Sequence, residues 1–381
     1  MKIAFYTPTT SGGHAGYSKC LLEGLARAEP NHRLFLCTGD DLEDEFTSKL
    51  YQIVKLFPGI KNRNEFPSSA HWAISRLLYY HRRDRAFLHW VTRNRPDVVH
   101  LQQEWFVPLA RKLISDLKLL GVRVVITVHN LFRHEDHFPW HSKIQHFLEA
   151  RAWRNADKLI VMSSRLANQL TQIAGVRVGC VAVIPHFVWP YGSTYSADQM
   201  EARRKMRRVL LFGAIRRNKG IEDFIESCKQ CTDIQGLIAG YCPDKRYEKS
   251  LRARLEAGER KVEFTNRFFA ESELPELYGS CSVAVFPYTS FSSQSGALFL
   301  ATANETPIVG SDAGAIGVTI EEAKLGMVFP RGDVAKLSAA LLRMHEPQEY
   351  VRAHGAARIL KRHQSAEAVG AQLSQLYRSL H

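Results

Sequence analysis

Short apolar runs rich in β-branched and aromatic residues alternate with amphipathic stretches along the chain, and this alternation restricts the fold more than any other feature. The first two runs, Lys2–Tyr6 and Arg33–Cys37, predict strands, with a helix from Tyr17 to Ala28 between them. Strands joined through helices run parallel, because the helix returns the chain to the edge where the first strand began. The first half therefore predicts a parallel sheet with helices on both faces. Its further strands are expected at Val98–Leu101, Val122–Val128, Lys158–Met162 and Val181–Ile184.

The same alternation starts again in the second half of the chain. Residues 186–206, which include a proline and a glycine, are expected to be a linker between the halves. We predict an α/β protein of two Rossmann-like, doubly wound domains, at residues 1–185 and 207–360, with a C-terminal helix at 361–381 that packs back on the N-terminal domain. Ligands bind at the carboxyl ends of the strands in such sheets, so two facing domains would hold them in an inter-domain cleft.

Composition excludes several classes of protein. Of the 381 residues, 45% are hydrophobic and 23% are charged, which rules out a disordered or collagen-like chain. No apolar run approaches the ~18 residues of a membrane-spanning helix, and the apolar start of the chain is too short for a secretory signal. Seven cysteines, an odd number, do not predict a disulfide framework. We therefore expect a cytoplasmic protein.

Positive charge is concentrated in one region. The net charge is +13, and six arginines fall between residues 76 and 95, among tryptophans, tyrosines and leucines. This mixture is typical of a surface that meets phosphate groups at an apolar boundary, such as an anionic membrane surface at the inner face of the cell membrane or a lipid-linked diphosphate. Nucleic acid attracts the same residue types, but no zinc-finger, RRM or KH signature supports it, so we expect no nucleic-acid partner. The alternative is an ordinary solvated helix whose aromatic residues face the core.

Glycines follow the first expected strand, in Ser11-Gly12-Gly13-His14-Ala15-Gly16. Glycines let the backbone approach a ligand closely, and amides at the start of a helix favour an anion. The spacing does not match G-x-G-x-x-G, and no P-loop lysine follows. The segment therefore predicts either a ligand-binding loop or a simple tight turn.

Basic residues follow the first strand of the second half, in Gly213-Ala214-Ile215-Arg216-Arg217-Asn218-Lys219-Gly220. Positive charge between the carboxyl end of a strand and the start of a helix suits the diphosphate of a nucleotide donor. A basic surface turn is the alternative, but the position at the ligand-binding edge of the sheet favours a donor site.

Small hydroxyl-bearing residues run into an expected helix, in Ser292-Ser293-Gln294-Ser295-Gly296-Ala297. The amides of Ser295, Gly296 and Ala297 would be unpaired donors at the start of that helix, which suits a phosphate. An ordinary helix cap has the same residue types.

A histidine, His129, ends an apolar strand of the first half, where a role in the cleft is favoured over that of a buried structural histidine. Glu104 and Trp105 follow a strand on the same edge and would either contact acceptor hydroxyls or simply pack. A group of acidic residues and histidines lacks the spacing of a zinc site and is expected to border the acceptor: His134, Glu135, Asp136, His137 and His141.

In their order and spacing, these motifs resemble glycosyltransferase family 4, the retaining nucleotide-sugar transferases of GT-B fold. The resemblance covers nearly the whole chain. It rests on the glycines after the first strand, the basic loop, Ser293–Gly296 and three further segments, Thr127–Asn130, Ile184–His186 and Thr306–Gly314. It implies two Rossmann-like domains that bind the acceptor and the nucleotide sugar, respectively.

The resemblance also implies roles for individual residues. Arg216 and Lys219 would hold the donor diphosphate and stabilise it as it leaves, and His129 would contact the transferred sugar near its reacting carbon. These three are the expected catalytic residues, while Gly13 would lie against donor and acceptor. The loop for the distal phosphate and the segment that packs on the base complete the expected donor site: Ser293, Gln294, Ser295, Gly296, Ala297, Asn266, Arg267 and Phe268. Acceptor contacts are expected from Gly12, His14, Glu104 and Trp105.

The chain departs from the usual family pattern at three positions. Ser292 and Leu300 stand where many members have glutamates that contact the sugar and the ribose, although a subset of the family carries Ser-Gln-Ser-Gly here. Ala214 stands where an arginine is usual, and Arg216 is the expected substitute. The phosphate half of the donor site is thereby kept, while the roles of the two glutamates are unassigned.

The expected function is transfer of a sugar, with retention, from a UDP- or GDP-sugar to a hydroxyl of a glycan or lipid-linked acceptor in cell-surface polysaccharide synthesis. Cations at the diphosphate stabilise the charge that develops as the glycosidic bond breaks. No paired carboxylates of glycosidase type and no D-x-D motif are present, so we expect no metal and no cofactor. The resemblance implies a front-face reaction in which the leaving phosphate takes the acceptor's proton, with no protein nucleophile. Two alternatives stay open: a sugar-nucleotide epimerase of the same fold, and a catalytically silent module that binds glycans or membranes.

Overall fold

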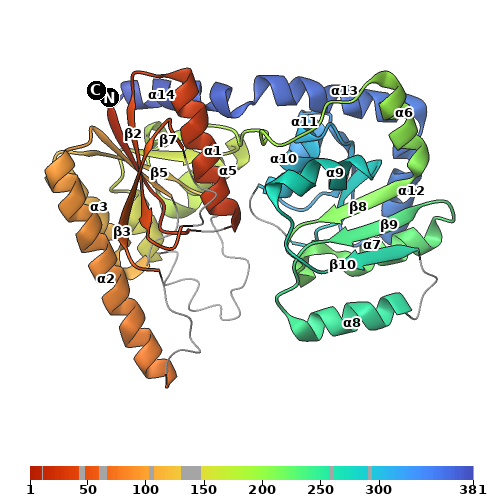
Figure 1. The fold of residues 1–381 in the computed structure, drawn as a ribbon, viewed down its shortest axis with the longest axis horizontal. Coiled ribbons are helices and arrows are strands. Elements are labelled where there is room, and N and C mark those ends of the chain that lie inside the picture. The colour runs from red at the N-terminus through yellow and green to blue at the C-terminus, as the bar shows by residue number, and fades with distance from the viewer. Residues whose placement is uncertain are drawn as a thin grey trace. The chain divides into compact units, whose positions relative to one another are not determined.

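The two halves of the chain form separate parallel sheets. In this computed structural model the chain divides into two units, one of residues 1–185 with 366–381 and one of residues 186–365 (Figure 1). The structure describes residues 1–10, 12–42, 48–59, 67–102, 107–129, 147–256, 261–290 and 294–380.

The first unit is built on a seven-stranded parallel sheet in the order β3-β2-β1-β4-β5-β6-β7. All five residues of β4 are buried, as in other strands that are covered on both faces. The strands are β1 (Lys2–Tyr6), β2 (Arg33–Gly39), β3 (Gln52–Phe57), β4 (Val98–Gln102), β5 (Arg123–Thr127), β6 (Lys158–Val161) and β7 (Val181–Val183).

A helix from the far end of the sequence completes the first unit. Helix α14 (Ala366–Arg378) packs on α1 (Gly12–Ala28), and a Cβ at Gly24 would lie 2.0 Å from the Ala366 carbonyl oxygen, so the glycine allows the two backbones to meet. The Tyr377 hydroxyl of α14 is 2.5 Å from Nδ1 of the buried His100 in β4. The other α-helices among the described residues of this unit are α2 (Ser69–Asn94), α3 (Val107–Leu119) and α5 (Ser164–Ala174).

The second unit is built on a six-stranded parallel sheet in the order β10-β9-β8-β11-β12-β13. Its strands are β8 (Arg208–Phe212), β9 (Gln235–Ala239), β10 (Val262–Thr265), β11 (Val283–Phe286), β12 (Ile308–Ser311) and β13 (Gly326–Phe329). Its helices are α6 (Ala197–Met206), α7 (Ile221–Gln230), α8 (Lys245–Glu256), α9 (Leu274–Gly279), α10 (Gly296–Ala303), α11 (Ala315–Glu322), α12 (Val334–Met344) and α13 (Pro347–His363).

The structure divides the chain differently from the sequence analysis at two points. The expected linker, residues 186–206, is part of the second unit and contains α6. The second unit also extends to residue 365, so the C-terminal segment of the first unit begins at 366 instead of 361. The helix expected at 361–381 covers the end of α13 and all of α14, because α13 ends at His363 and α14 begins at Ala366.

All seven cysteines are free thiols. Cys228 and Cys231 have C-x-x-C spacing at the end of α7, and both belong to the apolar core of the second unit. Burial raises the pKa of Cys228 to about 12 and raises that of Cys231 as well. Both groups are therefore protonated packing residues, since thiolates are the reactive and metal-binding form.

Candidate functional site

Loops at one edge of the second sheet carry most of the expected donor residues. Because the strands are parallel, their carboxyl ends lie along one edge. The basic loop follows β8, residues 266–268 follow β10, and residues 287–290 follow β11, with Ser295 directly before α10. The topology thus places three separate segments of sequence on one side of the unit.

Lys219 and Ser295 meet on one side chain, that of Tyr288. Lys219 ends the 3-10 turn η3 (Arg217–Lys219), and its ammonium group donates a hydrogen bond to the Tyr288 hydroxyl while lying 3.9 Å from the centre of that ring. The same hydroxyl is 3.2 Å from Oγ of Ser295, the residue that precedes α10. Tyr288 is buried, so the expected cationic loop and the expected phosphate loop are joined through a fixed aromatic side chain.

Backbone contacts hold these two loops together. The Thr289 amide donates to the Asn218 carbonyl at 3.0 Å, and Nδ2 of Asn218 donates to the Ser290 carbonyl at 3.1 Å. Gly220 has a φ of 64°, and a Cβ there would lie 1.8 Å from the Pro287 carbonyl oxygen. Only glycine fits this approach, and the backbone of the β8 loop is thereby placed against that of the β11 loop.

The two arginines of the basic loop have different surroundings. Arg216 precedes η3 in an extended conformation, and its side chain is exposed. Arg217 lies over the Tyr247 ring at 4.5 Å and is 3.9 Å from the Asp244 carboxylate. The charge of Arg217 is thus directed toward the start of α8, which leaves Arg216 and Lys219 as the candidates for a diphosphate.

The start of α10 presents backbone donors. Ser295 does not cap the helix with its side chain, which bonds to Tyr288 instead. The amides of Ser295, Gly296 and Ala297 therefore belong to a first turn where intrahelical partners are lacking and where the helix dipole favours an anion. Gln294 directly precedes this turn and is half-buried, as is Leu300 within α10.

Phe268 and Tyr241 form an exposed aromatic pair at the same edge. Their rings stack with centres 4.3 Å apart and planes at 21°, although Phe268 is 75% exposed and Tyr241 is 42% exposed. Tyr241 follows β9 and Phe268 follows β10. Flat, exposed aromatic surface of this kind suits the stacking of a ligand ring.

The two residues before Phe268 hold its loop in place. The Oδ1 atom of Asn266 accepts a hydrogen bond of 2.8 Å from the Cys242 amide, which joins the loops after β9 and β10. Arg267 pairs with Glu273 at 2.7 Å. Both side chains have partners within the unit, and Phe268 is the exposed aromatic member of the expected base segment.

His129 is half-buried at the carboxyl edge of the first sheet. Its Nε2 is 2.8 Å from Oε1 of Gln102, the last residue of β4. His14 and Tyr17 of α1 meet its ring edge-on, at centroid distances of 4.8 and 5.1 Å. Segments after β1, β4 and β5 therefore converge on this histidine, and α1 begins beside it at Gly12, with Gly13 exposed.

Gln102 carries an unused donor in this cluster. Its side chain is 2% exposed, and its Nε2 has no hydrogen-bond partner within the described residues. A buried amide without a partner is costly, so the group is suited to donate to a polar ligand.

Four residues of these clusters had no role assigned from the sequence. Three of them stand at or within two positions of a strand's carboxyl end, where ligand-binding side chains gather in parallel sheets. That position, combined with a polar or aromatic residue type, is the signal that could have found them. They are Gln102, Tyr241 and Tyr288, with Tyr17 in the first turns of α1 as the fourth.

Several expected residues lie outside the described ranges. Among the residues that the structure does describe, no three metal-ligating side chains come together, and no helix is long and apolar enough to cross a membrane. Outside the description are Glu104, Trp105, Ser292, Ser293, His134, Glu135, Asp136, His137 and His141.

Two family models match the chain. The model described as "Glycosyltransferase Family 4" matches residues 11–189, and the model described as "Glycosyl transferases group 1" matches residues 206–347. The chain belongs to glycosyltransferase family 4. The resemblance seen in the motifs is thereby confirmed.

This family 4 chain is also similar to individual proteins. It is 25% identical over 268 residues to the 2-deoxystreptamine N-acetyl-D-glucosaminyltransferase of Streptomyces fradiae. The match covers 65% of this chain and 62% of that protein. The chain matches less than two thirds of the length of its curated relatives.

Solved structures resemble it over its whole length. Sucrose-phosphate synthase from Thermosynechococcus elongatus is 20% identical with a TM-score of 0.77, over 100% of this chain and 98% of the other. The Anabaena protein HepE, solved in complex with UDP-glucose, is 17% identical with a TM-score of 0.74 over 100% of both chains. The fold of this family 4 chain is therefore GT-B, with two Rossmann-like domains, as predicted.

Proposed function

We propose that the protein transfers a sugar, with retention and without a metal, from a UDP- or GDP-sugar to a hydroxyl of a glycan or lipid-linked acceptor in cell-surface polysaccharide synthesis. The observation that carries this proposal is the joint contact of Lys219 and Ser295 with Tyr288. It brings an ammonium group and a helix N-terminus together at the edge of the sheet where ligands bind.

The charge on the reacting groups explains why this arrangement suits the chemistry. As the bond between the anomeric carbon and the phosphate oxygen breaks, positive charge develops on the sugar and negative charge on the departing diphosphate. Lys219 and Arg216 stabilise that diphosphate together with the first amides of α10. The acceptor oxygen forms the new bond on the same face, and its proton passes to the departing phosphate oxygen, so no protein nucleophile is needed.

The first unit supplies the acceptor side of the proposal. His129, held by Gln102, contacts the transferred sugar, and His14 lies beside it at the start of α1. The Nε2 of Gln102, which has no hydrogen-bond partner among the described residues, is a donor for a sugar or acceptor hydroxyl.

The nucleotide base stacks on the exposed Tyr241–Phe268 pair in this proposal. HepE, a structural neighbour, was solved with UDP-glucose, and one curated relative transfers N-acetylglucosamine by name. UDP-glucose and UDP-N-acetylglucosamine are therefore the first donors to test. GDP-mannose tests the alternative base, guanine.

Thermal unfolding in the presence of each donor tests the donor assignment. A ligand that binds only the native state at 100 times its Kd stabilises it by about 2.7 kcal/mol. At least one donor should raise the Tm, and Lys219→Ala or Arg216→Ala should reduce that rise. Lys229→Ala is the control, because Lys229 lies on α7 and pairs with Glu226. If none of the donors raises the Tm, a silent binding module replaces the transferase proposal.

Two further measurements separate the reaction from its alternatives. NMR of the stabilising sugar nucleotide, incubated without acceptor, should show an unchanged sugar, whereas an epimerase would convert it. Product formation with acceptor should show a retained anomeric configuration and should persist in EDTA. Inversion of configuration, or loss of turnover that added metal restores, would contradict the corresponding part of the proposal.

Association with the inner face of the cell membrane belongs to the same proposal. It is supported by the six arginines between residues 76 and 95, most of which lie on α2. Co-sedimentation with phosphatidylglycerol vesicles should be stronger than with phosphatidylcholine vesicles and should weaken with salt. Binding that is indifferent to both would remove this part of the proposal.

A further inference from the structure

The N-terminal half of α2 exposes apolar side chains. Ile74 is 62% exposed, Leu77 47% and Leu78 50%, whereas the later residues Phe87 and Val91 are buried in the core of the first unit. In Figure 1 the first turns of this 26-residue helix extend beyond the sheet that its other end covers. Neighbouring exposed apolar side chains of this kind indicate a binding surface.

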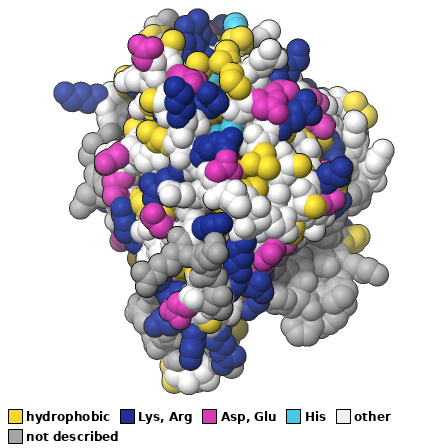
Figure 2. All heavy atoms as spheres, turned by 90° about the vertical axis from the view of Figure 1, so that its right-hand side faces the viewer, with side chains coloured by type: hydrophobic (Ala, Val, Ile, Leu, Met, Phe, Trp, Pro, Cys, Tyr) yellow, Lys and Arg dark blue, Asp and Glu magenta, His cyan; other side chains and the backbone are white. Residues whose placement is uncertain are grey.

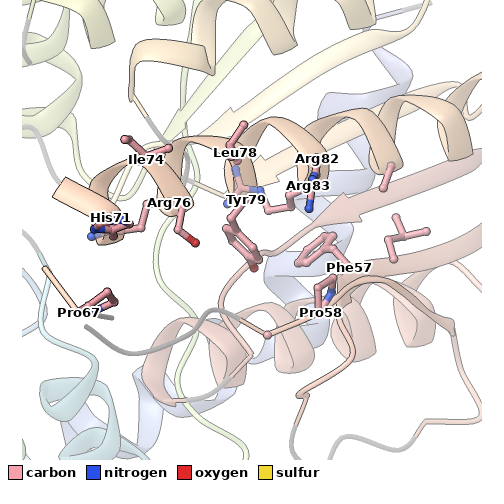
Figure 3. A pocket seen from close by; sticks show the side chains of 14 residues that line it. Phe57, Pro58, Pro67, His71, Ile74, Arg76, Leu78, Tyr79, Arg82 and Arg83 are labelled. Atoms are coloured by element: carbon pink, nitrogen blue, oxygen red, sulfur yellow. The ribbon is translucent and has the colours of Figure 1, made fainter. Parts of the chain in front are cut away.

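A pocket of about 640 Å³ lies against this part of α2 (Figure 3). Its volume is within the range of small-molecule sites. Figure 3 shows Pro67 and His71 toward one end, Arg82 and Arg83 toward the other, and Tyr79 between them. The opposite wall is the end of β3 and the residues after it, Leu56–Gly59.

The lining residues follow one face of the helix. They recur at intervals of three and four, so a single stripe of α2 faces the pocket along four turns. Apolar members dominate the middle of the stripe, and two arginines stand toward its end. The stripe consists of His71, Ile74, Ser75, Leu78, Tyr79, Arg82, Arg83 and Ala86.

Two cations at the pocket lack an acidic partner within the described residues. Arg82 is exposed and forms no ion pair with a described residue. Arg76 forms no ion pair with a described residue either; its guanidinium lies over the Trp72 ring and donates a hydrogen bond of 2.6 Å to the Tyr80 hydroxyl. The Nε atom of Arg76 is buried and has no hydrogen-bond partner in the part of the chain that the structure describes. Arg83 differs, because it is neutralised by Asp84 at 2.9 Å.

The charge of this region is unusually one-sided. Acidic, basic and apolar side chains are interspersed over much of the face shown in Figure 2. Between residues 67 and 96, by contrast, Asp84 is the one acidic residue and its charge is already paired. The carboxylates of Asp40 and Asp41 lie at Gly59 on the opposite wall, but neither forms an ion pair with Arg82 within the described residues. An apolar pocket with an exposed arginine toward one end complements a ligand that joins a hydrocarbon chain to a phosphate.

We propose that this pocket binds the hydrocarbon chain of a lipid-linked, phosphate-bearing acceptor, with Arg82 contacting the phosphate. The proposal rests on the proposed function in that it names the class of acceptor. An acidic peptide fits less well, because most of the pocket lining beside Arg82 is apolar.

The position of the pocket suits such an acceptor. Phe57 ends β3 at the carboxyl edge of the first sheet, the same edge at which α1 and His129 follow β1 and β5. Strands are spaced by about 4.8 Å, so β1 lies roughly 10 Å and β5 roughly 19 Å from β3. A lipid held in the pocket would thus place the sugar or hydroxyl beyond its phosphate near His129.

Farnesyl diphosphate, a single-chain isoprenoid diphosphate, is the probe for this pocket. It is titrated as a monomer into the full chain by calorimetry, in the presence of saturating UDP so that the proposed donor site is occupied. Binding should persist with UDP and should be much weaker for farnesol, which lacks the phosphates, and for inorganic pyrophosphate, which lacks the chain. Competition by UDP, or equal binding of pyrophosphate, would overturn the pocket as the site.

Adjacent leucines give a matched pair of variants. Leu78→Asp should weaken farnesyl diphosphate binding by about tenfold or more, since it places a charge in the apolar lining. Leu77→Asp makes the same change at similar exposure but does not line the pocket, and it should bind within about twofold of the parent. Both side chains are exposed, so both variants should fold. An unaffected Leu78→Asp, or an equal loss in Leu77→Asp, overturns the proposal.

The arginines allow the same comparison. Arg82→Gln should weaken the probe, whereas Arg85→Gln, also exposed on α2 but outside the pocket lining, should not. The outcomes are separable from those of the transferase proposal. Turnover on a water-soluble sugar acceptor without probe binding would refute only the pocket, while probe binding without any donor-dependent stabilisation would refute only the transferase.

Discussion

The ammonium group of Lys219 donates a hydrogen bond to the buried hydroxyl of Tyr288. The ring of the same tyrosine lies beneath that ammonium group, so the lysine is held in one orientation by two contacts with one residue. Fixing a free lysine side chain costs about 2 kcal/mol of rotamer entropy. Because the tyrosine already fixes it in the folded protein, a diphosphate would meet a cation that is largely preorganised.

Tyr288→Phe tests this preorganisation. The variant keeps the ring but removes the hydroxyl that Lys219 and Ser295 share, so we expect kcat to fall by about 10- to 100-fold with a smaller change in KM. Steady-state kinetics with the stabilising donor measure the changes in kcat and KM separately. Tyr247→Phe is the matched control, because Tyr247 is equally buried and its hydroxyl bonds to Glu222 on α7. Equal losses in both variants would indicate a general effect on the unit.

His129→Ala separates the two halves of the proposed site. The residue lies in the first unit, with Gln102 and His14 around it, so the variant should lose about 10- to 100-fold in turnover while UDP still raises the Tm as in the parent. His89→Ala, at an exposed position on α2, should change neither. Loss of the UDP effect in His129→Ala would show that the histidine supports folding and not transfer.

The strands that the sequence predicted are those with continuous apolar runs. β4 and β5 are buried almost throughout, because helices cover both faces of the sheet, and their sequences are therefore mostly apolar. β3 was missed because it is an edge strand with one fully buried residue and a lysine within it. β13 has no strong apolar signal in the sequence, because it begins with glycine and its last residue alone is fully buried.

The helix within the expected linker was missed for a different reason. Helix α6 has one buried residue, Arg203, whose guanidinium donates to the carbonyls of Tyr278 and Cys281 at 2.9 and 3.0 Å. Arg204 of the same helix donates to the His345 carbonyl at 2.7 Å. A helix held largely by hydrogen bonds of its arginines has no continuous apolar stripe to detect, and the linker was predicted from the proline and glycine before it.

The site was predictable to the level of loops, not of contacts. Parallel strands bring the segments at 216–219 and 295–297 to one edge whatever their side chains do. That Tyr288 joins Lys219 to Ser295, or that Arg217 instead faces Tyr247 and Asp244, depends on packing between residues far apart in sequence. No local pattern encodes such contacts.

His345 should make the second unit sensitive to acid. Burial, opposed in part by a hydrogen bond to the Leu341 carbonyl, lowers the pKa of His345 to about 4 from 6.5. The unfolded chain therefore binds a proton that the folded chain does not between pH 6.5 and 4, and stability falls as the pH falls through this window. The shift corresponds to a loss of about 3 kcal/mol.

Urea unfolding at pH 7 and pH 4.5 measures this dependence. His345→Gln should lower stability at pH 7 and reduce the difference between the two pH values, since the titrating group is gone. His363→Gln, at an exposed position near the end of α13, should leave the difference unchanged. An undiminished difference in His345→Gln would assign the acid sensitivity to other groups.

Gly220→Ala should damage both stability and turnover through the contact between the β8 and β11 loops. Its φ of 64° costs a side chain about 1 kcal/mol by itself. Gly332 isolates that cost, because it has a φ of 76° and a Cβ there would meet nothing within 4 Å. At Gly220 the Cβ would also lie 1.8 Å from the Pro287 carbonyl oxygen, so the loop that carries Lys219 must move away from the segment that carries Tyr288. In urea unfolding, Gly220→Ala should therefore lose about 2 kcal/mol more of the free energy of unfolding than Gly332→Ala loses. It should also lower kcat, whereas Gly332→Ala should keep its kcat. Equal losses of stability and normal turnover in both variants would mean that the close approach of the two loops does not position the lysine.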